Sequence, residues 1–356
     1  MDLRITVAAS MLPASRTRAA SAFKSICQQS RAEPLIELLE ACGLPAPTHR
    51  ALLREALDRA DDALESAERL GMAPVVLTDG RYPTLLACIP DPPPVLWVRG
   101  DPAVISRPTV AIVGSRAATG YAQEVAGRLA GELAERGLVV SSGLARGVDS
   151  AAHRGCLEGG GLSVAVLGSG LDRIYPPEHG GLAVSISRQG ALVSELGPGA
   201  APLPEHFPLR NRIISGISLA VVVVEASEKS GSLITARCAL EQGRDVMAVP
   251  GNVLSGRNRG SHGLLKDGAK VVETADDILE ELGWPARKSD PVQASSRSLE
   301  TDPLLTRMDE GEVYRLEELV ERTGWAAHKL LPRLMDLELR GSVSSLGAGR
   351  FSRTAK

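Results

Sequence analysis

The chain has 356 residues, of which 44% are apolar and only 3% aromatic, and its formal net charge is −3. This length allows two or three domains with a substantial core, while the scarcity of aromatic residues argues against folds that stack many bases on rings, such as OB-folds and RRMs. Because the net charge is slightly acidic, a nucleic-acid-binding surface would have to be a local basic patch.

The N-terminal part of the chain is predicted to be helical. Residues 1–30 are rich in Ala, Ser and Arg, a composition that can mimic a transit peptide, and we expect a disordered or loosely helical extension there. Residues 31–100 are predicted to form a small helical domain and a connector. Apolar residues between Leu53 and Leu70 recur at helical spacing and are expected to be core. The proline-rich segment 81–98 is predicted to be an extended connector that packs against the next domain.

Residues 101–283 are predicted to form a doubly wound, Rossmann-like α/β domain with a mostly parallel sheet. Amphipathic stretches such as 123–136 and 234–242 alternate with short β-branched runs. The run 219–224 is apolar on both faces, which suits a central strand that helices cover on either side. Strands are expected at 109–113, 138–141, 163–167, 191–194, 219–224 and 246–249.

The C-terminal part is predicted to be a separate small unit. The polar segment 284–302 has the composition of a flexible linker. Within residues 303–356 we expect a helix that begins near Val313, a longer helix over 326–339 and a hairpin over 342–351. Helix, helix and hairpin in this order are typical of a winged helix-turn-helix.

The ends of the predicted parallel strands carry glycine, serine and basic residues. Ligands gather at the carboxyl ends of such strands, glycine lets the backbone approach them closely, and free amides at helix N-termini attract anions. The loops at 114–120, 141–147 and 225–232 and the segment 207–212 meet at this edge. The candidate binding residues are Gly114, Ser115, Arg116, Arg146, Phe207, Arg210, Asn211, Arg212, Lys229, Ser230, Gly231 and Ser232.

No cofactor is expected at this edge. The first loop lacks GxGxxG, because Gly114 and Gly120 are six residues apart, and the second strand ends in Ser-Ser-Gly without the acid that would hold an adenosine ribose. The sequence contains no GK[ST] motif of a P-loop, no HExxH and no Cys/His cluster for a metal. The five cysteines are odd in number and lack CxxC spacing, which indicates reduced thiols in a cytoplasmic protein. The longest apolar run, 219–224, is too short to span a membrane.

The number of loops points to an extended anionic ligand. A mononucleotide needs one phosphate cradle, whereas a row of about five suits a polyanion that lies across the edge. Phe207 is the only phenylalanine of this domain, and it is either an anchor of its loop in the core or a ring that stacks a base. For Asp149 and His153, four residues apart, a helix cap and a stabilising contact are favoured over an acid–base pair. Arg257 and Arg259 are interpreted as part of a surface loop.

Five sequence blocks over about residues 80–350 resemble the bacterial DNA-processing protein A family (DprA/Smf). They are VGSR at 113–116, SGLARGVDSAAH at 142–153, FPLRNRIISG at 207–216, KSGSLITA at 229–236 and AVPG at 248–251. The C-terminal unit is similar to the winged-helix domain of many members, and the region before residue 80 looks like the SAM-like domain of the family. One departure is Ser261-His-Gly, where members more often have an Asn-containing turn.

The resemblance implies an extended Rossmann fold that binds single-stranded DNA without regard to sequence and is not an enzyme. It also implies a homodimer that protects incoming DNA and helps to load a RecA-type recombinase during natural transformation. By motif position it assigns DNA contacts to Arg116, Phe207, Arg210 and Lys229, with Arg146, Asn211 and Arg212 as neighbours.

Two other functions remain open at this point. Nucleotide phosphoribohydrolases of the lysine-decarboxylase-like family pair similar glycine loops, but their Pro-Gly-Gly-x-Gly-Thr-x-x-Glu motif ends in a glutamate that the turn at 229–237 lacks. A nucleotide-sensing adaptor would instead use the winged helix to contact duplex DNA. Acidic residues offset the basic ones of that unit, so a partner-binding role is equally compatible with its sequence.

Overall fold

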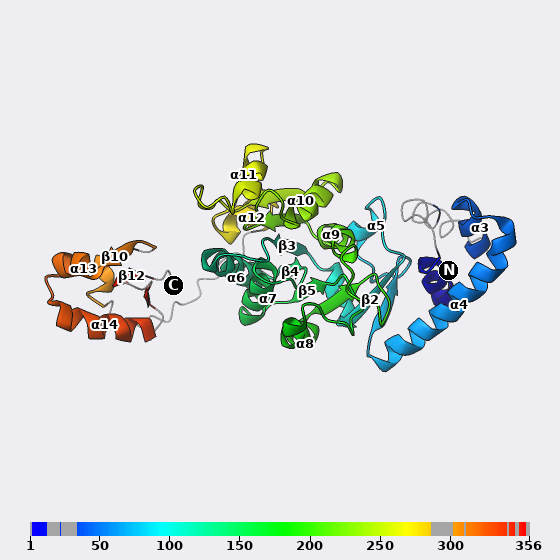
Figure 1. Ribbon diagram of the computed structural model, residues 1–356, viewed down its shortest axis with the longest axis horizontal. Coiled ribbons are helices and arrows are strands. Elements are labelled where there is room, and N and C mark those ends of the chain that lie inside the picture. Colours follow the sequence, from blue (N-terminus) through cyan, green and yellow to red (C-terminus); the bar gives the residue numbers. More distant parts are fainter. Residues whose placement is uncertain are drawn as a thin grey trace. The chain divides into compact units, whose positions relative to one another are not determined.

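The computed structural model describes residues 2–12, 22, 34–285, 302–309, 311–339, 342–345 and 349–353. The chain divides into two compact units, Met1–Arg287 and Lys288–Lys356 (Figure 1). None of the helices in the described part of the chain has the length and apolarity that a membrane span requires.

The first unit begins with helices α1 (Leu3–Ser10), α3 (Pro34–Ala41) and α4 (Ala46–Arg69). Small side chains of α1 pack with the Ala-rich face of α4 in one apolar cluster, and Arg4 pairs with Asp61 at 2.6 Å. Residues Thr6 to Ala9 are therefore buried, so this part of the expected extension is an ordered helix. Residues 13–21 and 23–30 lie outside the described residues.

The connector expected over 81–98 contributes to the sheet. β1 (Ala73–Val76) pairs antiparallel with β2 (Val95–Gly100), and β2 pairs antiparallel with β6 (Ala191–Ser194); α5 (Thr84–Ala87) lies between β1 and β2. The sheet thus begins at Ala73 and not within the predicted domain 101–283. The prolines precede β2 and remove no donor from it, while Trp97 within β2 is only 1% exposed. Burial of this apolar strand therefore decides its structure.

The described strands of this unit form one sheet in the order β1-β2-β6-β5-β4-β3-β7-β8-β9. All pairs from β6 to β9 are parallel. The strand order reverses at β3, which pairs with β4 on one side and β7 on the other. The loops that follow β3 and β7 therefore run to opposite faces, and such a switch point leaves a crevice at the carboxyl edge. The remaining strands are β3 (Thr109–Val113), β4 (Val139–Ser142), β5 (Ser163–Val166), β7 (Ala220–Val223), β8 (Asp245–Ala248) and β9 (Lys270–Val271).

Helices cover both faces of the sheet, which confirms the doubly wound α/β fold (Figure 1). On one face pack α6 (Gly120–Glu135), α7 (Val148–Glu158), α8 (Gly180–Gln189) and α12 (Ala275–Glu281). On the other pack α9 (His206–Gly216), α10 (Ser232–Glu241) and α11 (Arg259–Lys266). The helices α6 and α7 cross so closely that a Cβ at Gly155 would lie 2.0 Å from the carbonyl oxygen of Gly127. Only glycine fits there.

The second unit has the order of a winged helix. It comprises β10 (Val313–Arg315), α13 (Leu316–Thr323), α14 (Ala327–Leu339), β11 (Val343–Ser345) and β12 (Arg350–Arg353), with strand order β10-β12-β11. Its small core includes Tyr314, Leu334 and Phe351. Residues 313–315, expected to open the first helix, instead form a strand, because Tyr314 pairs across the sheet with Phe351 and both rings are buried.

Candidate nucleic-acid interface

A cavity of about 600 Å³ lies at the carboxyl edge of the sheet, where the strand order reverses; we call it the edge cavity. Its walls come from the loops after β3, β4, β5, β6 and β7, from α9 and from the start of α10. Nine of the twelve predicted binding residues line it: Gly114, Ser115, Arg116, Phe207, Arg210, Asn211, Ser230, Gly231 and Ser232.

The loop after β3 is held against the end of β7. The Ser115 backbone N–H donates to the Glu225 carbonyl oxygen at 2.7 Å, and a Cβ at Gly114 would lie 2.5 Å from Val148 Cγ2. The Glu225 carboxylate is buried and accepts from the Thr119 hydroxyl at 2.7 Å, and this hydroxyl in turn caps α6. Glu225 lies two residues after β7, at the carboxyl edge of the sheet, yet it is not among the predicted binding residues. Its charge is engaged in fixing the loop.

Three side chains form an aromatic and cationic group at the edge cavity. Phe207 is half-buried in the first turn of α9, and the Arg116 guanidinium carbon lies 5.5 Å from its ring centroid, within cation–π range. The ring centroid of Tyr175 lies 5.5 Å from that of Phe207, and Tyr175 is 40% exposed. Tyr175 was not predicted, and its only sequence signal is an aromatic residue in the loop that follows β5. The Phe207 ring lines the edge cavity and is not among the buried side chains of the core clusters.

Arg210, predicted as a DNA contact, lines the edge cavity but is largely buried. The segment 207–212 belongs to α9, and Arg210 is only 4% exposed. Its Nη1 donates to the Val166 carbonyl oxygen, and its Nε donates to Asn211 Oδ1 at 3.2 Å. Burial lowers the pKa of Arg210 to about 10, so it stays charged at neutral pH. The nearby glycine, Gly143, leaves room for the guanidinium, since a Cβ there would lie 2.3 Å from it.

The carboxylate of Asp149 is buried and interacts electrostatically with the Arg210 guanidinium. Burial raises the pKa of Asp149, while the Arg210 charge and two backbone donors oppose that rise. The donors are the N–H groups of Gly143 at 3.1 Å and Ala145 at 3.3 Å, so the carboxylate fastens the loop after β4. His153 has a different partner, Ser163 Oγ at 2.7 Å, and burial lowers its pKa to about 3. It is neutral at physiological pH.

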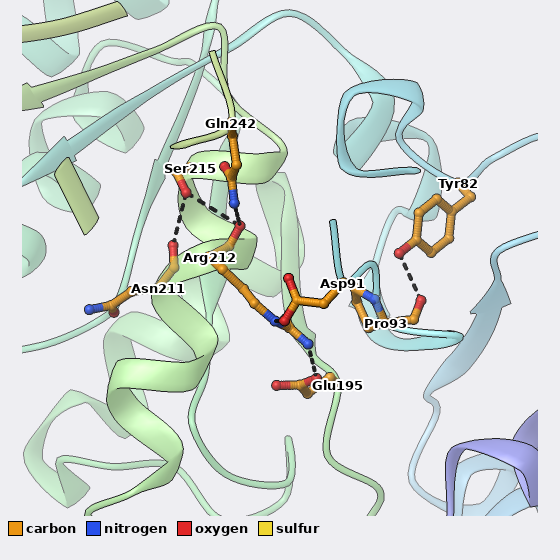
Figure 2. A network of polar contacts seen from close by, with 8 residues as sticks. All are labelled: Tyr82, Asp91, Pro93, Glu195, Asn211, Arg212, Ser215 and Gln242. Carbon is orange, nitrogen blue, oxygen red and sulfur yellow. Dashed lines mark hydrogen bonds and ion pairs between the residues drawn. The ribbon is translucent and has the colours of Figure 1, made fainter. Parts of the chain in front are cut away.

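Arg212 is tied to acidic residues on the far side of α9. Its Nε donates to Asp91 Oδ2 at 2.8 Å and its Nη2 to Glu195 Oε2 at 2.7 Å. Figure 2 shows Arg212 between these two carboxylates, with Asn211 pointing to the other side of the helix. Successive helical residues are about 100° apart, so Arg212 faces away from Phe207 and Asn211. Arg212 does not line the edge cavity.

The last two predicted cations are exposed. Arg146 lines a small cavity of about 30 Å³ together with Arg116, Tyr175 and Phe207, and its Nε donates to Glu178 Oε1 at 2.5 Å. Both side chains of this ion pair are about half exposed, at 58% and 48%. Lys229 is exposed beside Ser230, which lines the edge cavity. Within the described residues, no group of His, Cys, Asp and Glu could hold a metal ion.

Several groups of the edge cavity fit the parts of a nucleic-acid strand. Exposed Arg116 and Lys229 can neutralise phosphates, and the Phe207 and Tyr175 rings offer apolar surface to a base. The edge thus places cationic and aromatic side chains together in one local cavity. It is not a broad basic surface.

Two family descriptions match the sequence. Residues 73–283 match DNA recombination-mediator protein A, and residues 288–349 match the DprA winged helix domain. The first match begins where β1 begins, at Ala73. Together the two matches cover the sheet of the first unit and the C-terminal unit as far as residue 349, just before β12.

Individual relatives agree with these matches. The chain is 40% identical to Protein Smf of Escherichia coli (strain K12) over 277 residues, 75% of this chain and 74% of that protein. It is 42% identical to the DNA processing protein DprA of Streptococcus pneumoniae over 232 residues, 65% of this chain and 82% of that protein.

Two solved structures are similar. The X-ray structure of DNA processing protein A from S. pneumoniae matches with a TM-score of 0.69 at 37% identity, over 78% of this chain and 96% of that one. DNA processing protein A of Helicobacter pylori, described by its single-stranded DNA binding mode, matches with a TM-score of 0.54 at 29% identity, over 59% of this chain and 95% of that one.

Proposed function

The chain belongs to the DNA recombination-mediator protein A family, and on this premise we propose that it binds single-stranded DNA in the edge cavity and processes incoming DNA in natural transformation. The observation that carries the proposal is the placement of exposed Arg116 against the Phe207 ring inside a cavity at the switch point of the sheet. The similarity to the H. pylori protein, whose described ligand is single-stranded DNA, supports it.

Binding follows from the chemistry of the residues around the edge cavity. Arg116, Arg146 and Lys229 neutralise phosphates, while Phe207 and Tyr175 contact a base. The backbone of Gly114 and Ser115 and the serines beside Gly231 approach the strand closely, because neither loop carries a bulky side chain there. None of these contacts selects one base over another. Duplex DNA binds poorly because its bases are stacked within the helix and their faces are not available.

The buried cations Arg210 and Arg212 have a structural role in this proposal. Arg210 holds the end of β5 through Val166, and Arg212 ties α9 to Asp91 and Glu195. We assign to both the anchoring of α9 in the fold, and not a direct contact with phosphate.

Family membership extends the proposal to partners. The protein loads a RecA-type recombinase onto the bound strand, protects that strand, acts as a homodimer in the cytoplasm and performs no catalysis. Asp149, a carboxylate that lines the edge cavity, accepts from two backbone amides, and we assign it to the loop after β4. Incubation with AMP should release no adenine.

A salt titration of oligo-dT binding against a matched duplex tests the proposal. We expect the double variant R116A/K229A to bind oligo-dT at least tenfold more weakly, since charge-assisted contacts contribute about 1.5–3 kcal/mol each. The slope of log affinity against log salt should fall by about 0.7 for each lost phosphate contact on a single strand. The matched control R54A/R59A removes the same charge from exposed positions on α4 and should change neither quantity. Unchanged affinity and slope in R116A/K229A would contradict the proposal.

A further inference from the structure

The loop between β8 and α11 projects beside the edge cavity and carries two aliphatic side chains into solvent. We call residues 251–258 the 251–258 loop. Val253 is 74% exposed and Leu254 is 92% exposed. Removing such side chains from water is favourable by about 25 cal/mol per Å², so two adjacent ones held in solvent mark a contact surface. The proposed function assigns no role to Val253 and Leu254.

The base of the 251–258 loop is fixed by internal contacts. A Cβ at Gly251 would lie 2.3 Å from Asn258 Cγ, so the two ends of the loop touch. The Leu254 N–H donates to Asn252 Oδ1 at 2.8 Å, and the Ser255 hydroxyl donates to the Asn252 carbonyl oxygen at 3.2 Å. His262 approaches Gly251 from α11, with 3.3 Å between its Nε2 and the Gly251 nitrogen. The turn that carries Val253 and Leu254 is therefore held by its own hydrogen bonds.

Arg257 of this loop and Gly260 of the following helix α11 contact the two walls of the crevice. Arg257 Nη1 donates to the carbonyl oxygen of Ala117, the residue after Arg116, at 2.9 Å. On the other side, the Gly260 N–H donates to the Ala226 carbonyl oxygen at 2.8 Å, and a Cβ at Gly260 would lie 2.6 Å from the Ser227 carbonyl oxygen. Ala117 and Ser227 both line the edge cavity. The loop is thus continuous with the walls of that cavity.

Cations flank the aliphatic tip. Arg257 and Arg259 are exposed, and Arg259 lies 4.0 Å from Glu228 in an ion pair whose members are both 67% exposed. Lys229 follows Glu228 on the neighbouring loop. Solvent screens exposed pairs of this kind, so Arg259 can exchange Glu228 for a phosphate. Cations close to apolar side chains suit the phosphates and bases of a single strand.

We propose that the 251–258 loop is a second contact for single-stranded DNA, which leaves the edge cavity past Ala117 and continues over this loop. Val253 and Leu254 pack against the face of a base, and Arg257 and Arg259 contact the phosphates on either side. The inference rests on the proposed function, since it extends the same strand beyond the edge cavity.

A length series of oligo-dT, from about four to about thirty nucleotides, tests this proposal with the full chain. We expect V253S/L254S to lower the affinity for the longest oligonucleotide about tenfold, and to leave the affinity for the shortest unchanged, because a short strand is held by the edge cavity. R259A should also weaken binding of the long strand alone and reduce its salt slope by about 0.7. The matched control V184S/L240S changes exposed aliphatic side chains on α8 and α10 and should bind every length as the wild type does.

The outcomes separate this inference from the proposed function. If V253S/L254S binds the longest strand as tightly as the wild type while R116A/K229A binds weakly, the 251–258 loop does not contact DNA. Binding in the edge cavity is then still supported. The same result accompanied by weaker association with a recombinase would assign the loop to a protein partner and also overturn the inference. If R116A/K229A binds every length normally, the proposed function itself fails. A photo-crosslinking residue in place of Leu254 should react with long oligo-dT and not with the short one.

Discussion

Two neighbouring regions of the α/β unit use the same residue types for opposite purposes. The side chains at the rim of the edge cavity are exposed or half-buried, and the Arg116 guanidinium carbon lies 5.5 Å from the Phe207 ring centroid. The buried layer below it is at most 8% exposed, and its polar atoms make short contacts with backbone and side chains. The rim consists of Arg116, Tyr175, Phe207 and Lys229, and the buried layer of Asp149, His153, Arg210 and Arg212.

The difference shows that a cation can bind a ligand only where the fold leaves its side chain accessible to solvent. Phe207, Arg210 and Arg212 lie within one sequence block, yet the helix directs them to three different environments. Changes in the buried layer should therefore alter the free energy of unfolding, and changes at the rim should alter DNA affinity. Each of the following variants tests this distinction between effects on stability and effects on DNA affinity.

The largest effect is expected for Arg212→Met. The substitution leaves Asp91 and Glu195 without their shared cation at largely buried positions, and removing one partner of a buried pair costs about 3–5 kcal/mol. Chemical denaturation should show this loss, while the folded protein keeps its affinity for oligo-dT. R59M on α4, where the ion pair is exposed, should cost less than about 1 kcal/mol. Weaker DNA binding at unchanged stability would place Arg212 at the rim.

Phe207→Ala should lower the affinity for oligo-dT by about 1–3 kcal/mol, because a lost stacking contact has that magnitude. Phe207→Leu keeps an apolar side chain without a ring and serves as the matched control, with a similar loss of affinity. Fluorescence anisotropy measures both. If the ring were instead an anchor of the core, Phe207→Ala would lower the melting temperature strongly and Phe207→Leu would restore it.

His153 should make the protein sensitive to acid. Burial lowers its pKa to about 3 in the folded state, against about 6.5 in the unfolded chain, so protonation favours unfolding. Its contribution to stability is complete above about pH 6.5 and is lost as the pH falls toward 3. Urea unfolding at a series of pH values should show a decline of up to about 1.4 kcal/mol per pH unit between about pH 6 and 5. H153Q, which cannot take up this proton, should flatten that decline, and an equal slope in both proteins would refute the assignment.

The smallest effect is expected for Glu178→Gln. This change releases Arg146 from an exposed ion pair, which solvent screens strongly. Oligo-dT affinity should rise about twofold at low salt and return to the wild-type value at high salt, since screening weakens both interactions. The control E55Q on α4 should have no effect on binding. A decrease in affinity would show that the pair positions Arg146 for the ligand.

Local patterns in the sequence by themselves determined the α/β alternation and most of the edge cavity. The β-branched run at 219–224 becomes β7, and the amphipathic stretch at 123–136 becomes most of α6. Backbone and burial preferences act over a few residues, which is why such periodicity carries over to the structure. Because ligands gather at the carboxyl ends of parallel strands, Gly114, Arg116 and Ser230 could be placed at one site from their positions alone.

Only the tertiary structure decided which of these residues face solvent. The prolines before β2 predicted a connector, whereas β2 is a strand whose partner β6 lies about a hundred residues further along the chain. The segment 207–212 looked like a loop because of Pro208, yet a proline in the first turn of a helix removes no hydrogen bond. Arg212 is buried because Asp91, 121 residues earlier, supplies its counter-charge. Desolvation of a charge depends on such distant partners, and no local pattern encodes them.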